Sequence, residues 1–456
     1  MRQSFSASLL ALCCLGCPDC SSVDVYGAFV SVAAQDAGLP DLGSDAAAQG
    51  TDAAATAQLG DSPVTLPPVA AKADDTSPMQ IDAGAVVPVA STEDVLCLRN
   101  LQQEDGCESA RKLAFGRAVC SCGDIVGTGI LSTQSTDPSA DLASVGADSS
   151  LSLRIGRREA VDDAPGEIDG AITVSGPGPS AISGNGASIR GDVSLAGELT
   201  FAGDVHVAGS VYARRMPRGN GTLAIDGNLR YANDRLPLDL PSSLQVAGDV
   251  AQGDYTVAPP CECNPANLAE LPRAIAAAES GNDDALAQLA PDSMSNLTSD
   301  RSFALSCGQY YFLSVSSLAS ITWQISGHVV VFVAGDFVVR GELKVTLAPD
   351  AELDVLVGGS LLLSKSASFG DPERPAASRI YVQAAVELET DVPAPGATTA
   401  DAMFVGNLFA PTASLQLAPH SEVYGSLFVR QLLVLQSLLV HYDPSVTSER
   451  GGHCDK

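Results

Sequence analysis

The sequence is poor in basic residues and in aromatic residues. Its 456 residues include 25 Lys and Arg against 54 Asp and Glu, which gives a formal charge of −29, and aromatic residues make up only 5%. Nucleic acid binding needs clustered Lys and Arg to neutralise phosphates, so no nucleic acid partner is expected. The same excess of acidic over basic residues argues against binding to anionic lipid through a basic patch. The scarcity of aromatic residues suits a narrow core of small and branched side chains.

The sequence also lacks the local motifs of common catalytic and metal sites. It contains no Gly-x-Ser-x-Gly elbow, His-Glu-x-x-His helix, phosphate loop, EF-hand or Gly-Gly-x-Gly-x-Asp calcium repeat. Lys344 and Lys365 are about one repeat apart, but no paired Asp accompanies them. His441, in the closing VHYD, is expected to make a hydrogen-bonded capping contact. We therefore expect no catalytic residue, no cofactor and no metal.

What the sequence does contain is a repeat near its C-terminal end. An aromatic or aliphatic residue followed by Val opens a short apolar run five times, at Phe332, Leu356, Tyr381, Phe404 and Phe428. The copies are 24, 25, 23 and 24 residues apart. A period of this length is typical of stacked supersecondary units that bury their apolar faces against one another. The fold class predicted is all-β: a parallel β-helix, or solenoid, with about 24 residues per coil in this part.

A shorter repeat of six residues precedes it. Glycines at 191, 197, 203 and 209 open successive hexads, and apolar residues fill the third and mostly the fifth position of each. Alternation along a strand sends these two positions to one face. Gly-Asp carboxylates such as Asp192 and Asp336 are expected to be solvated at strand starts. Hexad periodicity is a second β-helix signal.

The N-terminus resembles a bacterial lipoprotein signal. Residues 1–16 have an early Arg and an apolar middle, and Gly16 precedes Cys17 as in a lipobox. The resemblance implies that Cys17 carries a lipid anchor, and ordinary signal cleavage with free secretion is the alternative. The Ala-, Asp- and Pro-rich stretch that follows is expected to be a disordered tether, because it has too little apolar residue content to fold.

Eight further cysteines are expected to form disulfides, as is usual in an exported protein. The two Cys-x-Cys pairs are not spaced as zinc or redox motifs usually are, so structural disulfides are preferred over metal ligation. The pairing among the eight stays open. We expect the pairs to staple capping segments over the solenoid ends. The eight are Cys97, Cys107, Cys120, Cys122, Cys261, Cys263, Cys307 and Cys454.

The clearest helical signal lies between the two repeats, from Asn264 to Leu289. Asn264 can cap a helix, Pro265 suits a first helical position, and Pro272 is expected to bend or divide the helix. We interpret this stretch as an insertion packed on the solenoid flank, with a lid over a cleft as the alternative. The predicted order is signal peptide (1–16), lipid-anchored tether (17–94), cysteine-containing cap and lead-in (95–167), hexad β-helix (168–260), helical insertion (261–306), C-terminal β-helix (307–445) and tail (446–456).

Several of these motifs together resemble a known type of domain. The hexads, CECNPANL, SCGQYYF, LFAPTASLQL and the closing VHYD look like the uncharacterised β-helical domain of myxobacterial surface lipoproteins and pilin-associated, PilX-like proteins. The resemblance covers roughly residues 95–445. The hexads alone also resemble bactofilins, the polymer-forming β-helices, but a signal peptide and disulfides disagree with a cytosolic filament. No catalytic residue is implied by the resemblance.

The function expected is therefore non-enzymatic. The chain is interpreted as an exported lipoprotein, anchored in the outer membrane or at the cell surface rather than in the inner membrane, with a structural, adhesive or assembly role. Its partners would be the membrane through the anchor, other envelope proteins, further copies of itself, or polysaccharide. The alternative is a carbohydrate-active or carbohydrate-binding β-helix.

Overall fold

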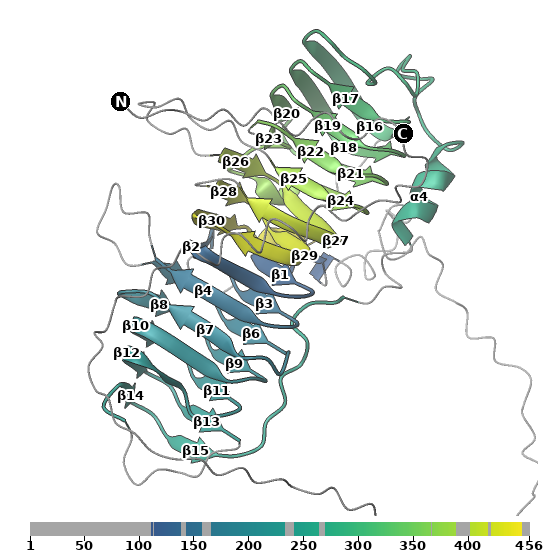
Figure 1. The fold of residues 1–456 in the computed structure, drawn as a ribbon. Helices are drawn as coiled ribbons and strands as arrows, with labels where there is room; N and C mark the ends of the chain where they lie inside the picture. Colours follow the sequence, from purple (N-terminus) through teal and green to yellow (C-terminus); the bar gives the residue numbers. More distant parts are fainter. Residues whose placement is uncertain are drawn as a thin grey trace, which may run out of the picture. The chain divides into compact units, whose positions relative to one another are not determined.

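The computed structural model describes residues 111–137, 143–156, 166–232, 241–263, 270–388, 402–417 and 421–448, with single-residue gaps at 113 and 366. In these residues the chain forms a parallel β-solenoid of about 12 turns spaced about 22 residues apart. The predicted fold class is confirmed. Figure 1 shows the strands stacked in successive coils.

The solenoid is built from an N-terminal half and a C-terminal half. The strands of the N-terminal half are β1 (Val119–Ser121), β2 (Ile125–Ser135), β3 (Val145–Ala147), β4 (Leu151–Ile155), β5 (Glu167–Ile168), β6 (Ile172–Val174), β7 (Ser180–Ser183), β8 (Ala187–Ile189), β9 (Val193–Leu195), β10 (Leu199–Val207), β11 (Val211–Ala213), β12 (Arg218–Ile225), β13 (Leu229–Tyr231), β14 (Leu244–Val246) and β15 (Val250–Gln252).

The C-terminal half is preceded by the helix α4 (Glu270–Ala278). Its strands and 3-10 turns are β16 (Arg301–Phe312), β17 (Val315–Ser317), β18 (Ile321–Val333), β19 (Phe337–Val339), β20 (Leu343–Leu347), β21 (Glu352–Val357), β22 (Leu361–Leu363), β23 (Ala367–Ser368), η1 (Pro375–Ala377), β24 (Ser378–Val382), β25 (Val386–Leu388), β26 (Ala402–Val405), β27 (Asn407–Leu417), β28 (Ser421–Tyr424), β29 (Leu427–Val434), β30 (Ser437–Tyr442) and η2 (Pro444–Thr447).

One ladder of inward-facing residues runs through both halves. Each residue of the ladder pairs in register with the next, and all are buried except the last, which is half-buried. Alternation along each strand sends these residues inward and their neighbours outward. In stacking order the ladder is Tyr310, Val331, Val355, Ile380, Leu408, Leu427, Val119, Val145, Ile172, Val193, Val211, Leu229 and Val250.

The order of the ladder shows that stacking order differs from chain order. The C-terminal half comes first, and its last coil pairs with the first coil of the N-terminal half, β1 with β29 and β2 with β29 and β30. We call this junction the seam. Residues 253–300, here called the connector, lead from β15 at one end of the stack to β16 at the other, past the seam. Figure 1 shows the blue first strands lying against the yellow last strands.

The hexads account for the regular part of the N-terminal half. Val193, Val211 and Leu229 stack at intervals of 18 residues, which is three hexads per coil. The carboxylate of Asp192 is exposed, and it also accepts a hydrogen bond of 2.7 Å from the backbone N–H of Ser210, one coil later. Asp336 does the same for the N–H of Ser360, at 2.8 Å. These carboxylates therefore connect adjacent coils as well as facing solvent.

The C-terminal repeat is less regular than its motif suggests. Phe332, Leu356 and Tyr381 stack in register as predicted. Phe404 does not continue this column, because it pairs with Ala367 on another face. Phe409 takes the place instead and pairs with Phe428. The prediction that Phe404 belongs to this column is wrong. The coil from Tyr381 to Phe409 is longer than average and the coil from Phe409 to Phe428 is shorter, so the mean spacing still agrees with the repeat.

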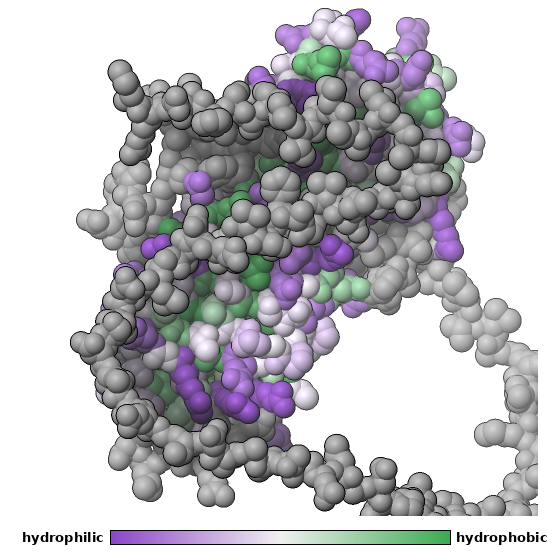
Figure 2. All heavy atoms as spheres, viewed as in Figure 1, coloured by the Kyte–Doolittle hydropathy of each residue, from purple (hydrophilic) through white to green (hydrophobic). Residues whose placement is uncertain are grey.

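Aromatic side chains and the helix complete the C-terminal half. Trp323, Phe337, Phe369 and Phe404 form a continuous column inside the solenoid, with ring centroids 5.7 to 5.9 Å apart. Helix α4 contacts β16, β18 and β21 through buried residues that include Ile275. The segment expected to be a cap and lead-in, 95–167, contains β1 to β4, which lie beside the seam. On the face seen in Figure 2, hydrophilic and hydrophobic residues are interspersed over the described surface.

Candidate functional site

The backbone at the seam is joined by ordinary strand pairing. Backbone hydrogen bonds cross it from Cys122 N–H to Val429 O (2.9 Å), from Leu427 N–H to Ala118 O (2.9 Å) and from Leu432 N–H to Asp124 O (3.1 Å). The same distances occur within each half. The side chain of Ser121 adds a hydrogen bond of 3.0 Å to the carbonyl of Arg430. Two stretches far apart in sequence thus form one uninterrupted sheet surface.

Two glycines allow the chains to approach closely at the seam. A Cβ atom at Gly127 would lie 1.9 Å from the carbonyl oxygen of Val434, and one at Gly129 would lie 2.1 Å from that of Gln436. Both distances are far below van der Waals contact, so any side chain here would push the two coils apart. The close pairing at the seam therefore requires glycine at both positions of β2, Gly127 and Gly129.

The outer face of the C-terminal half is covered near the seam by the residues before β1. Phe115 is fully buried, and its ring lies 5.7 Å from that of Tyr381 and 6.3 Å from that of Phe409. The ring of Phe409 in turn lies 4.8 Å from that of Phe428, at a tilt of 48°. The hydroxyl of Tyr442 donates a hydrogen bond of 2.8 Å to the carbonyl of Phe115. These contacts add apolar burial across the seam to its backbone pairing.

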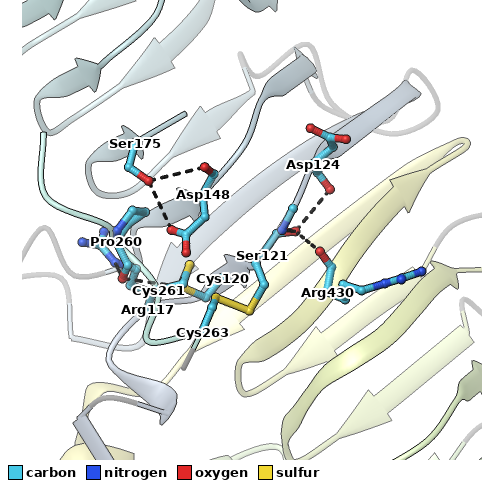
Figure 3. The surroundings of a disulfide bond; sticks show 12 residues. Arg117, Cys120, Ser121, Asp124, Asp148, Ser175, Pro260, Cys261, Cys263 and Arg430 are labelled. Atoms are coloured by element: carbon cyan, nitrogen blue, oxygen red, sulfur yellow. Dashed lines mark hydrogen bonds between the residues drawn. A yellow bond between two sulfur atoms is a disulfide. The ribbon is translucent and has the colours of Figure 1, made fainter. Parts of the chain in front are cut away.

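Two disulfides fix the connector beside the seam, as Figure 3 shows. Cys120 is bonded to Cys261 and Cys122 to Cys263, with a sequence separation of 141 in each pair. The position differs from the expected one, because the pairs lie in the middle of the stack and not over its ends. They fasten the connector to β1 and to the residue that follows it, next to the C-terminal half that the connector leads into.

The surroundings of the disulfides are shaped to receive the connector. A Cβ atom at Gly146 would lie 2.8 Å from the side chain of Pro260, so only glycine leaves room there. Arg117 donates a hydrogen bond of 3.0 Å to the carbonyl of Pro260. Burial lowers the pKa of Arg117, and burial raises the pKa of Asp148 despite its hydrogen bonds with Cys261 and Ser175. Figure 3 shows Asp148 pointing toward Ser175.

A buried ionic cluster lies on the same covered face, further from the seam. Arg379 donates to Asp354 at 2.6 Å and to Glu352 at 2.7 Å, and His328 lies 2.8 Å from Asp354. Arg111, from the covering segment, is 3.8 Å from Glu352. Burial alone would raise the pKa of Asp354, but the charge of Arg379 and the hydrogen bonds outweigh it and hold that pKa well below its usual value. The cluster is internally neutralised and inaccessible, which is typical of a structural role.

The cluster continues toward the seam as a polar column. Asn407 stacks next to Arg379 and donates to the carbonyls of Pro375 and Ser378 at 2.7 and 2.9 Å. Ser426 follows and donates to the Asn407 side chain at 3.0 Å. Each buried polar group in this column has a partner, as a closed interface requires.

A partly exposed pair lies on another face, in the last two coils of the C-terminal half. His441 Nε2 and Glu422 Oε1 are 3.0 Å apart, and the ring of Tyr424 stacks on that of His441 at 4.4 Å. The hydrogen bond with His441 lowers the pKa of Glu422. His441 makes a hydrogen bond as predicted, but it does not cap the solenoid, because β30 pairs with β2 in the middle of the stack. Lys344 pairs in register with Ser368, so the two lysines considered in the sequence do not form a column.

The predicted site residues are thus distributed as follows. Of the eight cysteines, four form the seam disulfides, and Cys307 is disulfide-bonded as well. Cys17, Cys97, Cys107 and Cys454 lie outside the described residues. The Arg379 cluster was not foreseen. Its signal was present, because Asp354 and Arg379 are one coil apart and carry opposite charges inside apolar runs.

The fold and the seam define a parallel β-solenoid assembled from two stacked halves. Residues 262–449, which contain the C-terminal half and the connector from Glu262 onward, match the profile of a domain of unknown function, DUF7305. No curated protein and no solved structure matches the chain. Among the described residues, no helix is long and apolar enough to cross a membrane, and no group of three or more His, Cys, Asp or Glu is placed to hold a metal ion.

Proposed function

We propose that this protein is a non-enzymatic lipoprotein of the cell envelope with a structural and assembly role. The observation that carries the proposal is the seam, where Leu427 and Val119 continue one ladder across two separate parts of the chain. Solenoid ends present unpaired backbone groups, and this chain uses them to join one solenoid to another. Such a joint builds a rigid support from modules, and it needs no reactive side chain.

The envelope location is supported by the sequence and by the disulfides. Disulfides persist in oxidising compartments outside the cytosol, which is compatible with export. The lipobox-like Gly16-Cys17 supports an anchor on Cys17, and the long Ala-, Asp- and Pro-rich stretch supports a tether between membrane and solenoid. The resemblance to myxobacterial surface lipoproteins and PilX-like proteins favours the outer membrane or cell surface.

Labelling with a radioactive fatty acid tests the anchor directly. The full chain is expressed in a bacterium that processes lipoproteins, beside a Cys17→Ser variant and a Cys20→Ser control. The unaltered chain and the control should be labelled, and Cys17→Ser should not be. The labelled protein should be recovered in the membrane fraction. Label retained by Cys17→Ser, or a chain found only in the medium, would remove the lipoprotein part of the proposal.

A second candidate function is binding or cleavage of polysaccharide, which the Glu422 and His441 pair favours. The pair is partly exposed and sits on adjacent coils, where carbohydrate-active solenoids place their acid and base groups. The hydrogen bond with His441 lowers the pKa of Glu422 and so favours its carboxylate form, which suits an acceptor for sugar hydroxyls better than a strong general base. Incubation of the purified chain with acidic and neutral polysaccharides tests this candidate. Cleavage or retention that disappears in Glu422→Gln would establish it, and the absence of both would eliminate it.

A further inference from the structure

One end of the stacked solenoid is closed by the chain itself. At the β16 and β17 end, Leu313 N–H bonds to Pro291 O and Ser316 N–H to Met294 O, both at 2.9 Å or less. The carboxylates of Asp283 and Asp284 accept from the backbone of Gln309 and Tyr311. Residues 283–297 therefore satisfy the edge of the outermost coil, which is how solenoids usually prevent further stacking.

The opposite end, formed by β14 and β15, is open in the part of the chain that is described. β14 pairs with β12 and β15 with β13, and no described strand pairs with their far edges. In a parallel ladder alternate residues direct their N–H and C=O groups to opposite sides. The backbone N–H and C=O groups of Val246 and Val250 face away from the previous coil. Their side chains are half-exposed, whereas the residues they stack on, Ile225 and Leu229, are 1% and 0% exposed.

A column of hydrogen bonds runs along one corner of successive coils, from Asp192 to Asp249, and also ends here. Asp192 accepts from Ser210 N–H, the Ser210 hydroxyl accepts from Asn228 N–H at 3.0 Å, and Asn228 accepts from Asp249 N–H at 2.8 Å. Asp249 is the last member of the column and is exposed. Its carboxylate has the position of an acceptor for the next coil. The end is thus formed like an interior coil of the stack.

The strands at this end carry little charge. Residues 242–252 contain one charged residue, Asp249, and no Lys, Arg or Pro, although the chain has a formal charge of −29. Exposed edges are normally protected by charged residues, especially Lys, or by Pro. Two copies of an acidic chain meet with least repulsion where acidic residues are fewest. Neither β14 nor β15 contains an acidic residue.

We propose that the β14–β15 end is a docking surface for a second copy of this chain. Two identical edges pair about a two-fold axis, so β15 of one copy lies antiparallel to β15 of the other. Because residues 283–297 close the opposite end, assembly stops at two copies and gives a dimer with its capped ends outermost. This inference rests on the structural role proposed above and adds the partner and the stoichiometry. It extends the coil-on-coil contact of the seam from within one chain to two chains.

Sedimentation velocity of the full chain tests the pairing. Cys17→Ser is used as the background throughout, so that lipid does not drive association. We expect a concentration-dependent equilibrium between monomer and dimer. Val250→Lys places a charge at the half-buried last position of the inward-facing ladder, within the proposed docking surface, and should weaken the dimer by about tenfold or more. Ala224→Lys adds the same charge on an outer face one coil away and should leave the dimer intact, with circular dichroism confirming that both variants are folded.

Hydrogen exchange at the edge gives a second measurement that does not depend on a variant. The Val246 and Val250 amides should become slower to exchange as concentration rises. Monomers at every concentration would overturn the proposal, as would oligomers larger than two. Protection that is already complete in the monomer would overturn it too, because the chain would then cover its own edge. These failures leave the fatty-acid labelling unaffected, so they are distinguishable from failure of the envelope role.

Discussion

Val119 stacks directly on Leu427, although the two residues are separated by most of the solenoid in sequence. Both are fully buried, and each has the next coil of its own half on its other side. The contact makes the first coil of the fold the middle coil of the stack. The stability of either half therefore depends on the other.

The seam glycines give the sharpest test of this dependence. Gly127→Ala would place a methyl group 1.9 Å from the carbonyl oxygen of Val434. We expect it to lower the free energy of unfolding by about 3 kcal/mol, at the upper end of the range for overpacking, because backbone pairing must separate to admit the methyl group. Urea denaturation followed by circular dichroism measures the change. Gly253→Ala is the control, since nothing lies within 4 Å of that position, and equal stability of the two variants would contradict the seam.

The two disulfides should be redundant for stability. Each closes a loop with a sequence separation of 141, and such loops contribute about 4 to 5 kcal/mol through the unfolded chain. Once one bond is present, the other closes only a very short additional loop. Replacing Cys120 and Cys261 by Ser should therefore cost only about 2 kcal/mol, and replacing all four cysteines should cost about three times as much. Denaturation under oxidising conditions compares the unaltered chain with these two variants. A cost for one pair that is half of the cost for all four cysteines would show that the two disulfides act independently, which contradicts this interpretation.

Arg379 should be essential to the folded state. Arg379→Met would leave the buried side chains of Asp354 and Glu352 without the guanidinium group that donates to both, at a cost of about 3 to 5 kcal/mol. Arg340→Met, at an exposed position in the same half, should change the free energy of unfolding by less than about 0.5 kcal/mol. The difference between the two midpoints of denaturation is the relevant measurement. A mild effect of Arg379→Met would mean that the cluster is open to water.

Asp354 should make stability depend on acid pH. Its pKa in the folded chain lies below the ordinary value of 3.8, so its ionised form stabilises the fold above that value and the contribution is lost as the pH falls. The free energy of unfolding should decline between about pH 5 and pH 2, and less steeply in Asp354→Asn. Asp350→Asn, on an exposed turn, should keep the original slope. Identical slopes in all three chains would show that Asp354 does not titrate abnormally.

The sequence was sufficient to predict the coils but not their order of stacking. Period and alternation are local properties, so Phe332, Leu356 and Tyr381 could be aligned by spacing alone. Phe404 and Phe409 both precede small apolar runs, and only the register of β27 decides between them. The seam has no comparable signal, because a coil edge looks the same whether its neighbour is the next coil or a distant one. Gly127 and Gly129 permit the close approach at the seam, but glycines are common throughout the chain, so these two could not be singled out from the sequence.

The ionic cluster was missed for a related reason. Asp354 and Arg379 lie in strands whose inward-facing and outward-facing residues are both buried. In the sequence they are therefore single charged residues within apolar runs, and nothing local indicates which face they occupy. Their outer face is buried by Phe115 and Arg111, which belong to the other half of the chain. Pairing by charge at one-coil spacing would have suggested the contact between Asp354 and Arg379. It would not have shown that the pair is sheltered from solvent.

Hydrogen exchange at the seam tests the central claim most directly. The N–H groups of Cys122, Leu427 and Leu432 have their acceptors on the opposite half, and Val193 N–H has its acceptor, Ser210 O, within its own half. If the two halves form one solenoid, the three seam amides should exchange about as slowly as Val193, since all lie in interior coils. Exchange of the seam amides at the rate of an exposed turn residue such as Asp350, with Val193 still protected, would contradict the account.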